Sequence, residues 1–321
     1  MIALAVAFFL PSVACAHWHS IEANKMGTRV SVRLWHADAE AAKRAAGAAL
    51  DEIDRIERLM STYLADSRIS SINRGAATRP VVAGEELFGL IERSVQLSEL
   101  SGGAFDITYD SVGRHYDFRA RVRPDAATIS ADLALIDYRL IELHSDTHAV
   151  RFLADGVRIN LGGIAKGYAV ERAIQVLLEH GASSGAVTAG GDTRLLGSRQ
   201  GAPWIVGVQN PRDDGEIAVR LPLVDEAIST SGDYERYFEE AGVRFHHIIS
   251  PDSGRSASGV RSATVIGPDA VMTDGLSTAI FVLGPTAGLE LLRRLPDYEG
   301  VVIDEQQKLH FSEGLAAPVS E

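Results

Sequence analysis

The sequence has 321 residues but only one cysteine, Cys15, which lies in an apolar segment at the N-terminus. A single thiol cannot form an intrachain disulfide, a cysteine-based zinc site or a dithiol redox pair. Its position in a segment typical of a cleavable leader makes it a poor candidate for a catalytic nucleophile. The HExxH, nucleophile-elbow, Walker A and Rossmann patterns are also absent, so none of these motifs identifies the chemistry.

Basic residues are scarce relative to acidic ones, because 31 Lys and Arg stand against 43 Asp and Glu, a formal net charge of −12. There is no basic stripe, so no nucleic-acid partner is expected. A ligand that carries phosphates must be neutralised locally, by a metal ion, by helix N-termini or by a few placed cations. The composition, 46% hydrophobic and 23% charged, is that of a globular protein and excludes collagen-like, coiled-coil and wholly disordered chains.

Long hydrophobic runs are few. Residues 2–14 form an apolar run, interrupted by a proline, that is too short to cross a bilayer as a helix. It predicts a leader over residues 1–16 that is either cleaved after Ala16 or, through an imperfect lipoprotein box, lipidated on Cys15. The alternative is a buried first strand of a cytoplasmic domain. Residues 20–315 are expected to form the functional domain of an exported protein, and the mode of anchoring is open.

The hydrophobic periodicity predicts helices and strands that do not strictly alternate. Helices are expected after an Asp38 cap, in a short turn capped by Ser67, and at residues 85–100, 166–179 and 269–282. Strands are expected at residues 24–35, 139–143, 149–153, 157–161, 185–188, 204–208, 219–223, 227–229, 245–249, 262–266 and 300–303. This order favours an α+β body in two lobes over a doubly wound sheet.

Asp274 and Thr278 are four residues apart in the last predicted helix. Residues i and i+4 lie on one face of a helix, so the carboxylate and the hydroxyl can point at one spot. Both are hard oxygen ligands of the kind that suit Mg²⁺, and Ser277 is close enough to contribute through a water. The alternative is structural: Asp274 favours the N-terminal end of the helix dipole, and Thr278 is merely packed.

Glycine-rich segments are the second candidate feature. Residues 161–167 run from a predicted strand into a helix and include Lys166, a point charge suited to phosphate near free N–H groups. Residues 101–106 place two glycines before Phe105 and Asp106, an apolar plate and an acceptor suited to a heterocycle. Both segments also fit structural roles, as a tight turn and as a helix C-cap before a core phenylalanine. The segment at 189–192, Ala-Gly-Gly-Asp, has the same ambiguity.

His246 and His247 are adjacent in a predicted strand, so their side chains face opposite sides and cannot easily share one metal ion. One of them could act as a general base, and an ordinary core or surface role is the alternative. The pattern does not decide between the two histidines.

Six separated segments occur in a fixed order: MGTRVSV, STYLADSRISSIN, SGGAFD, LGGIAKGYAVERA, AGGD, and ISTSGDYERYFEEAGVRFHHIISPDSG followed by TDGLSTAIFVLG. The ordered set spans about residues 24–284 and resembles the FAD:protein FMN transferase family, known as the ApbE family. The resemblance implies an α+β fold with two lobes of mixed sheets flanked by helices and a ligand cleft between them. It also implies an Mg²⁺-dependent enzyme that moves the FMN half of FAD onto a threonine or serine hydroxyl of a target protein and releases AMP.

The resemblance also implies roles for particular residues. Its metal ligands would be the backbone carbonyl of Ala165 and the side chains of Asp274 and Thr278, with Ser277 at a position that some members fill with an acid. Its FAD site would comprise Met26, Tyr63, Ala104, Phe105, Asp106, Gly162, Lys166 and Ile248. His247, or else His246, would be the base for the incoming hydroxyl.

Many members of this family are exported or lipid-anchored, which implies a location on the periplasmic, extracytoplasmic side of the cytoplasmic membrane. The implied partner is a flavin-carrying subunit of a respiratory or electron-transfer complex. A divalent ion that bridges the diphosphate of FAD would draw this ligand to an acidic protein and stabilise charge on the leaving AMP. Transfer of this type depends on alignment and electrostatics rather than on a covalent nucleophile, in keeping with the lack of a triad or a thiol.

Two other functions use the same residues. One is Mg²⁺-dependent hydrolysis of FAD to FMN and AMP, in which water replaces the acceptor hydroxyl. The other is a non-catalytic periplasmic flavin-binding lipoprotein, against which the Asp274 and Thr278 pair argues.

Overall fold

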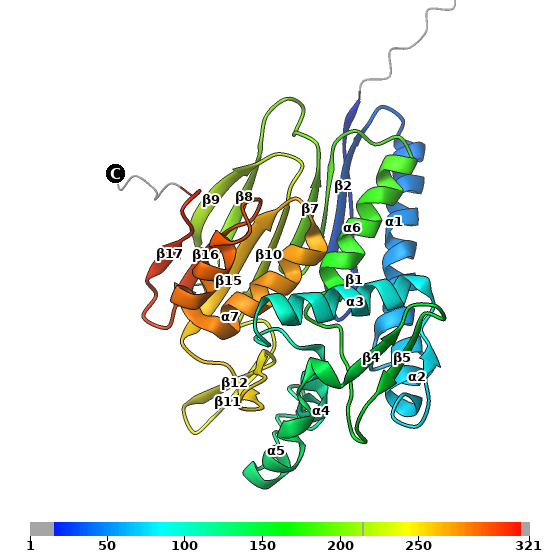
Figure 1. Cartoon of the computed structure of the whole chain (residues 1–321). Coiled ribbons are helices and arrows are strands. Elements are labelled where there is room, and N and C mark those ends of the chain that lie inside the picture. The colour runs from blue at the N-terminus through cyan, green and yellow to red at the C-terminus, as the bar shows by residue number, and fades with distance from the viewer. Residues whose placement is uncertain (1–15, 214, 316–321) are drawn as a thin grey trace, which may run out of the picture.

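The computed structural model describes residues 16–213 and 215–315, so the predicted leader lies outside the described residues except for Ala16. The central element is an eight-stranded sheet with the order β1-β2-β6-β7-β10-β15-β16-β17 (Figure 1). The strands are β1 (His17–Lys25), β2 (Thr28–His36), β6 (Gly185–Ala189), β7 (Asp192–Leu196), β10 (Ala227–Gly232), β15 (Val260–Gly267), β16 (Glu299–Asp304) and β17 (Leu309–Phe311).

All neighbouring strands of this sheet are antiparallel, whereas mixed sheets were expected. Three of the pairs are joined by short hairpins, which force an antiparallel arrangement. The α+β class itself is confirmed.

Helices cover one face of the sheet, and Figure 1 shows three of them side by side on it. Val30, Val32 and Leu34 alternate along β2 and are completely buried beneath this layer. The helices of the layer are α1 (Ala39–Met60), α6 (Ala165–Glu179) and α7 (Ala270–Arg293), with α3 (Glu85–Leu100) crossing below them. Helix α6 packs against both α1 and α7, and its first turn meets α7 at Gly167, where the candidate site lies.

The opposite face of the sheet is covered by a hairpin of β8 (Trp204–Gln209) and β9 (Ile217–Leu223). Trp204 and Leu221 of this hairpin pack with Ile228 of the sheet in a second apolar core. The molecule therefore has three layers in space: the helices, the eight-stranded sheet and the covering hairpin.

A second group of elements lies below the ends of the sheet strands in Figure 1. It contains a three-stranded sheet of order β3-β5-β4 and several short helices and hairpins. These elements are α2 (Arg68–Gly75), β3 (Val81–Val82), η1 (Ile107–Tyr109), α4 (Asp110–Gly113), α5 (Ala126–Asp132), η2 (Leu133–Leu135), η3 (Tyr138–Leu140), β4 (Ile141–His144), β5 (Ala149–Phe152), β11 (Tyr237–Glu240), β12 (Val243–His246), β13 (Ile249–Ser250) and β14 (Arg255–Ser256). One continuous apolar core joins both groups, and a ligand cleft between them stays a prediction.

The helix starts follow the predicted caps. The Asp38 carboxylate accepts from the backbone N–H groups of Glu40 and Ala41 at the start of α1. The Ser67 hydroxyl accepts from the N–H of Ser70 and caps α2. Helix α3 has the predicted bounds. These local signals are confirmed because caps act through neighbours in the chain.

Two of the strand predictions, those at 24–35 and 245–249, were wrong in part, and strands β1 and β7 were not predicted as separate strands. Residues 24 and 25 end a separate strand, β1, which was not predicted, and Met26 and Gly27 form a two-residue turn with φ of 52° and 70° before β2. Strand β7 was also missed. The predicted strand at 245–249 is interrupted, since β12 ends at His246 and β13 begins at Ile249.

The predicted strand at 157–161 is absent, although its apolar side chains are buried. Side chains replace the neighbouring strand: Asn73 accepts from the N–H of Ile159 at 2.8 Å and donates to its carbonyl oxygen at 2.9 Å. The next N–H, of Asn160, donates to the carbonyl oxygen of Ile107 at 2.9 Å. The segment is therefore extended and buried without belonging to a sheet.

Helix α7 spans Ala270–Arg293 but is broken at Gly284, whose φ of 81° and ψ of 174° are not helical and which precedes Pro285, so the predicted end at residue 282 lies next to this break and a second helical segment follows it. Helix α7 is the one helix among residues 16–213 and 215–315 that is long and apolar enough to cross a membrane by length and composition. Half of its most apolar window is buried inside the protein, against β10, β15 and β16. Its hydropathy is that of a core helix.

Candidate functional site

The site is built where the first turn of α6 crosses α7. A Cβ atom on Gly167 would lie 2.1 Å from the carbonyl oxygen of Ala270 and 2.7 Å from Cβ of Asp274. Only glycine permits this approach, which lets the Gly167 N–H donate to Oδ2 of Asp274 at 2.8 Å. The free N–H end of α6 is thereby joined to the predicted metal ligand on α7.

A second carboxylate reaches the same place from the sheet. Gly190 and Gly191 form the tight turn between β6 and β7, and a Cβ on Gly191 would lie 2.5 Å from the carbonyl oxygen of Thr230. The turn delivers Asp192, whose carboxylate forms an ion pair with Lys166. Oδ1 of Asp274 lies 3.6 Å from the same ammonium group. Asp192 is 1% exposed and Asp274 is 2% exposed.

One lysine thus faces two buried carboxylates. Burial and the negative charge of Asp192 raise the pKa of Asp274 to about 7. Burial opposes the charged form of Lys166, but Asp192 and Asp274 together hold the pKa of this lysine above its ordinary value. Oδ1 of Asp192 is buried without a hydrogen-bond partner. The cluster therefore has negative charge and an acceptor oxygen left over for a further cation.

Hydroxyl groups line the adjoining turn of α7. Ser231, from β10, lies 2.9 Å from the hydroxyl of Ser277 and 3.2 Å from that of Thr278. Ser277 also donates to the carbonyl oxygen of Asp274 at 2.8 Å and is completely buried, so its hydroxyl is already used within the fold. Thr278 is half-buried, and its Oγ1 lies 3.3 Å from the place of a Cβ on Gly163. Thr278 therefore faces the glycine-rich segment.

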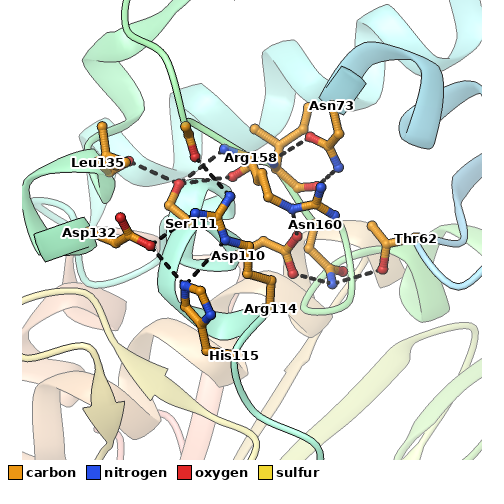
Figure 2. Close-up of polar contacts among 12 residues, drawn as sticks. Thr62, Asn73, Asp110, Ser111, Arg114, His115, Asp132, Leu135, Arg158 and Asn160 are labelled. Carbon is orange, nitrogen blue, oxygen red and sulfur yellow. Dashed lines mark hydrogen bonds and ion pairs between the residues drawn. The ribbon is translucent and has the colours of Figure 1, made fainter. Parts of the chain in front are cut away.

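The segment before α6 is held by the polar network drawn in Figure 2. The Asn160 side chain accepts from the N–H of Gly162 at 2.9 Å and donates to Asp110 at 3.1 Å. Arg158 donates to the same carboxylate at 3.0 Å. Gly162 is exposed, and Gly163 packs against the ring of Phe105. Two predicted flavin-site residues, Phe105 and Gly162, are thus brought to one loop.

The structure distinguishes the two histidines. Both ring nitrogens of His246 are engaged, because Nε2 donates to the carbonyl oxygen of Ala257 at 2.9 Å and Nδ1 accepts from the N–H of Ile248 at 3.3 Å. Its ring packs against Phe281. Nδ1 of His247 is buried without a partner. Burial and the positive charge of Arg236 lower the pKa of His247 to about 3, so its imidazole is neutral and, in the protein without ligand, a weak base.

The remaining predicted flavin-site residues occupy different settings. Met26, in the turn between β1 and β2, donates its N–H to Glu57 at 2.9 Å. The Tyr63 side chain is 87% exposed, Ala104 is half-buried, and Ile248 is buried next to His247. The Asp106 carboxylate is committed to the fold: it caps η1 by accepting from Thr108, and it accepts from the N–H of Tyr138 at 2.8 Å.

Sequence reasoning assigned no role to Asp192, Arg236 or Asn160. Arg236 lies beside the turn of Met26, whose carbonyl oxygen accepts from it at 3.3 Å, and its charge acts on both Lys166 and His247. It is a second cation at the site. The Gly-Gly-Asp turn was the one local signal for Asp192, and Arg236 and Asn160 carry no distinctive local pattern.

Residues 16–213 and 215–315 contain no group of three or more His, Cys, Asp or Glu side chains that could hold a metal ion. A cation at this site would rely on mixed oxygen ligands. Asp274, Thr278 and the unpartnered oxygen of Asp192 are hard donors that suit Mg²⁺, which keeps water or substrate oxygens in its other positions. Ala165 begins α6 directly before Lys166. The residues present therefore fit such an ion.

The fold and site together define an α+β protein suited to a ligand that carries phosphate. The model of the ApbE family matches residues 26–302, so the chain belongs to the ApbE family. A curated relative, the FAD:protein FMN transferase of Treponema pallidum (strain Nichols), is 32% identical over an alignment of 316 residues, gaps included, and the match covers 90% of this chain and 85% of the relative. The FAD:protein FMN transferase of Klebsiella pneumoniae (strain 342) is 30% identical, with 92% and 94% covered.

Solved structures agree. The ApbE protein of Thermotoga maritima superposes with a TM-score of 0.85 at 33% identity, covering 93% of this chain and 98% of that chain. The flavin transferase ApbE from Vibrio cholerae gives a TM-score of 0.82 at 25% identity, with the same shares covered.

Proposed function

We propose that this chain is an FAD:protein FMN transferase, which attaches FMN from FAD to a threonine or serine hydroxyl of an acceptor flavoprotein and releases AMP. Membership of the ApbE family and the names of its relatives support the reaction. The observation that carries the proposal is the cluster of Lys166, Asp192 and Asp274 at the N-terminus of α6. This arrangement offers a cation and metal-binding oxygens to a diphosphate.

The metal ion of the proposed enzyme would be Mg²⁺, and Asp274, Thr278 and the Ala165 carbonyl oxygen would hold it, with Asp192 as a further oxygen. When bound, it would neutralise the diphosphate and the charge that develops on the AMP leaving group. Ser277 is assigned to the support of this site through its hydrogen bonds to Asp274 and Ser231, rather than to direct contact. Lys166 and Arg236 would supply the remaining positive charge.

In the proposed step, the acceptor oxygen forms a bond to the phosphorus of the FMN half. The bond from that phosphorus to the bridging oxygen breaks, and AMP leaves with the electron pair. The hydroxyl proton moves to the imidazole of His247. The low pKa of His247 belongs to the protein without its ligand, and the negative charge of a bound diphosphate would raise the basicity of the ring.

Met26, Tyr63, Ala104, Phe105, Asp106, Gly162, Lys166 and Ile248 are proposed to line the FAD site. The exposed Tyr63 can contact the flavin or adenine rings, whereas Phe105 is 3% exposed and would act by supporting the glycine-rich segment at Gly163. Asp106 would act through the loop that it caps, since its carboxylate is occupied. The acceptor is proposed to be a flavin-carrying subunit of a respiratory or electron-transfer complex. The apolar segment at 2–14 supports export to the periplasm, by signal cleavage or with a lipid anchor.

A test mixes the purified protein with FAD, Mg²⁺ and a candidate acceptor, and measures AMP by chromatography and flavin fluorescence on the acceptor band of a denaturing gel. AMP formed only with the acceptor, together with a fluorescent band, is expected. AMP formed without acceptor would indicate FAD hydrolysis, and binding of FAD without AMP would indicate a non-catalytic flavin protein. An acceptor whose target threonine is replaced by valine and a chelator are the controls.

A further inference from the structure

The Asn160 carboxamide joins two loops that are separate in the sequence. Its oxygen accepts from the N–H of Gly162 at 2.9 Å, and its nitrogen donates to Asp110 at 3.1 Å and to the Thr62 hydroxyl at 3.2 Å. Figure 2 shows Asn160 between Thr62 on one side and Asp110 on the other. One loop is the Tyr63 loop, residues 61–67 between α1 and α2, and the other is the glycine loop, residues 161–164 before α6.

The amide of Asn160 has one permitted orientation. A carboxylate accepts and a backbone N–H donates, so Asp110 must face the NH₂ group and Gly162 the oxygen. The Asp110 side chain is itself fixed by Arg158 at 3.0 Å and is 6% exposed. The second hydrogen of the NH₂ group is then aimed at Thr62. The position of Thr62 relative to Gly162 is therefore set by a rigid, fully hydrogen-bonded side chain.

The Tyr63 loop depends on this contact. The other hydrogen bonds seen for residues 61–66 connect them with one another or with residues between Glu57 and Arg74, such as the Ser67 hydroxyl to the carbonyl oxygen of Ser61 at 2.7 Å. Thr62 alone among them reaches the glycine loop side of the site. The Tyr63 ring is 87% exposed, so the loop backbone, rather than packing, determines where the ring lies.

We propose that the Thr62–Asn160–Asp110 chain fixes the spacing between the Tyr63 loop and the glycine loop, which makes Thr62 and Asn160 positioning residues for FAD binding. The inference rests on the proposed function, since FAD is the ligand that both loops are expected to contact. A preorganised pair of loops loses little conformational entropy when the ligand binds, and the smaller entropy loss gives a higher affinity. Thr62 would act on the affinity for FAD without touching the transferred phosphorus.

The sharpest test replaces Thr62, because its side chain is half-buried and its loss does not open the core. Thr62→Val keeps the shape but removes the hydroxyl, and Thr62→Ser keeps the hydroxyl. The affinity for FAD is measured in Mg²⁺ without any acceptor, by titration of flavin fluorescence. Thr62→Val is expected to raise the Kd about three- to tenfold, the effect of one lost hydrogen bond, while Thr62→Ser stays within about twofold of the unsubstituted protein.

A matched control removes a bond of the same network that does not join the two loops. The Ser111 hydroxyl accepts from the N–H of Arg158 at 3.0 Å and is completely buried. Ser111→Ala is expected to lower the melting temperature and leave the Kd for FAD unchanged. Thr62→Val is expected to raise the Kd for FAD and leave the melting temperature unchanged. If the unsubstituted protein binds FAD but Thr62→Val and Thr62→Ser have equal Kd values, the positioning role of Thr62 is overturned and the proposed function is not. Failure of the unsubstituted protein to bind FAD would overturn both the proposed function and the positioning role of Thr62.

Discussion

Replacing Asp274 by asparagine removes one of the two buried carboxylates beside Lys166 and keeps an acceptor for the Gly167 N–H. The pKa of Asp274 is raised from 3.8 to about 7 in the folded protein by burial and by Asp192. One pKa unit corresponds to about 1.4 kcal/mol, so the ionised side chain costs the metal-free protein about 4 kcal/mol of folding free energy. The asparagine variant does not bear this cost.

The sign of the effect follows from proton binding. Well below pH 3.8, the ordinary pKa of the side chain, Asp274 is protonated in both the folded and the unfolded protein, and it contributes nothing. As the pH rises from about 4 to about 7, the unfolded chain loses the proton first, so the metal-free protein loses stability. Between pH 5 and pH 8 the stability of Asp274→Asn relative to the unsubstituted protein is therefore expected to increase by about 2–3 kcal/mol.

The assay is urea unfolding followed by tryptophan fluorescence in the presence of a chelator. Asp269→Asn is the control, because Asp269 caps the same helix, where asparagine is also a good cap, and its carboxylate pairs with Arg93 rather than with Lys166. With Mg²⁺ the stability difference narrows: binding stabilises the unsubstituted protein by about 2.7 kcal/mol at one hundred times the Kd and offsets most of the cost of the ionised carboxylate, whereas Asp274→Asn gains nothing and releases no AMP. If the stability difference between Asp274→Asn and the unsubstituted protein does not vary with pH, the pKa of Asp274 is not raised by burial and by Asp192, and the reasoning is refuted.

Two paired substitutions test the packing and the base. Gly167→Ala places a Cβ 2.1 Å from a carbonyl oxygen of α7 and should lower the free energy of unfolding by about 3 kcal/mol or more. Gly47→Ala in α1, where a Cβ meets nothing within 4 Å, should raise the free energy of unfolding by about 0.5–1 kcal/mol. Thermal unfolding measures both, and similar melting temperatures for the two variants would contradict the close contact of α6 with α7. His247→Ala should lower the transfer rate by about 10²- to 10⁴-fold with little change in stability, and His246→Ala should mainly lower the melting temperature because both ring nitrogens are bonded. Single-turnover transfer and calorimetry separate the two histidines, and the assignment fails if His246→Ala shows the larger kinetic defect in a folded protein.

The parts of the fold that the sequence predicted correctly depend on near neighbours. Asp38 and Ser67 cap their helices through N–H groups two or three residues away, and the hairpin between β4 and β5 follows from a polar turn. The segment at 157–161 has the apolar pattern of a strand, yet Asn73, more than eighty residues earlier, takes the hydrogen bonds of Ile159. The local pattern does not show which partner the backbone of this segment will have, because a neighbouring strand and the Asn73 side chain can each satisfy the same N–H and carbonyl groups.

The amino-acid order by itself determined the family-specific segments, the i and i+4 pair of Asp274 and Thr278, and the glycine-rich approach to α6. Tertiary structure alone brought Asp192 from a sheet turn to Lys166, occupied both nitrogens of His246 and left one of His247 unpaired. Spacing along a helix fixes which side chains share a face, since that geometry repeats with every turn. The charge and hydrogen-bond partners of a buried group depend instead on segments that are distant in the chain, and only folding decides which of them meet.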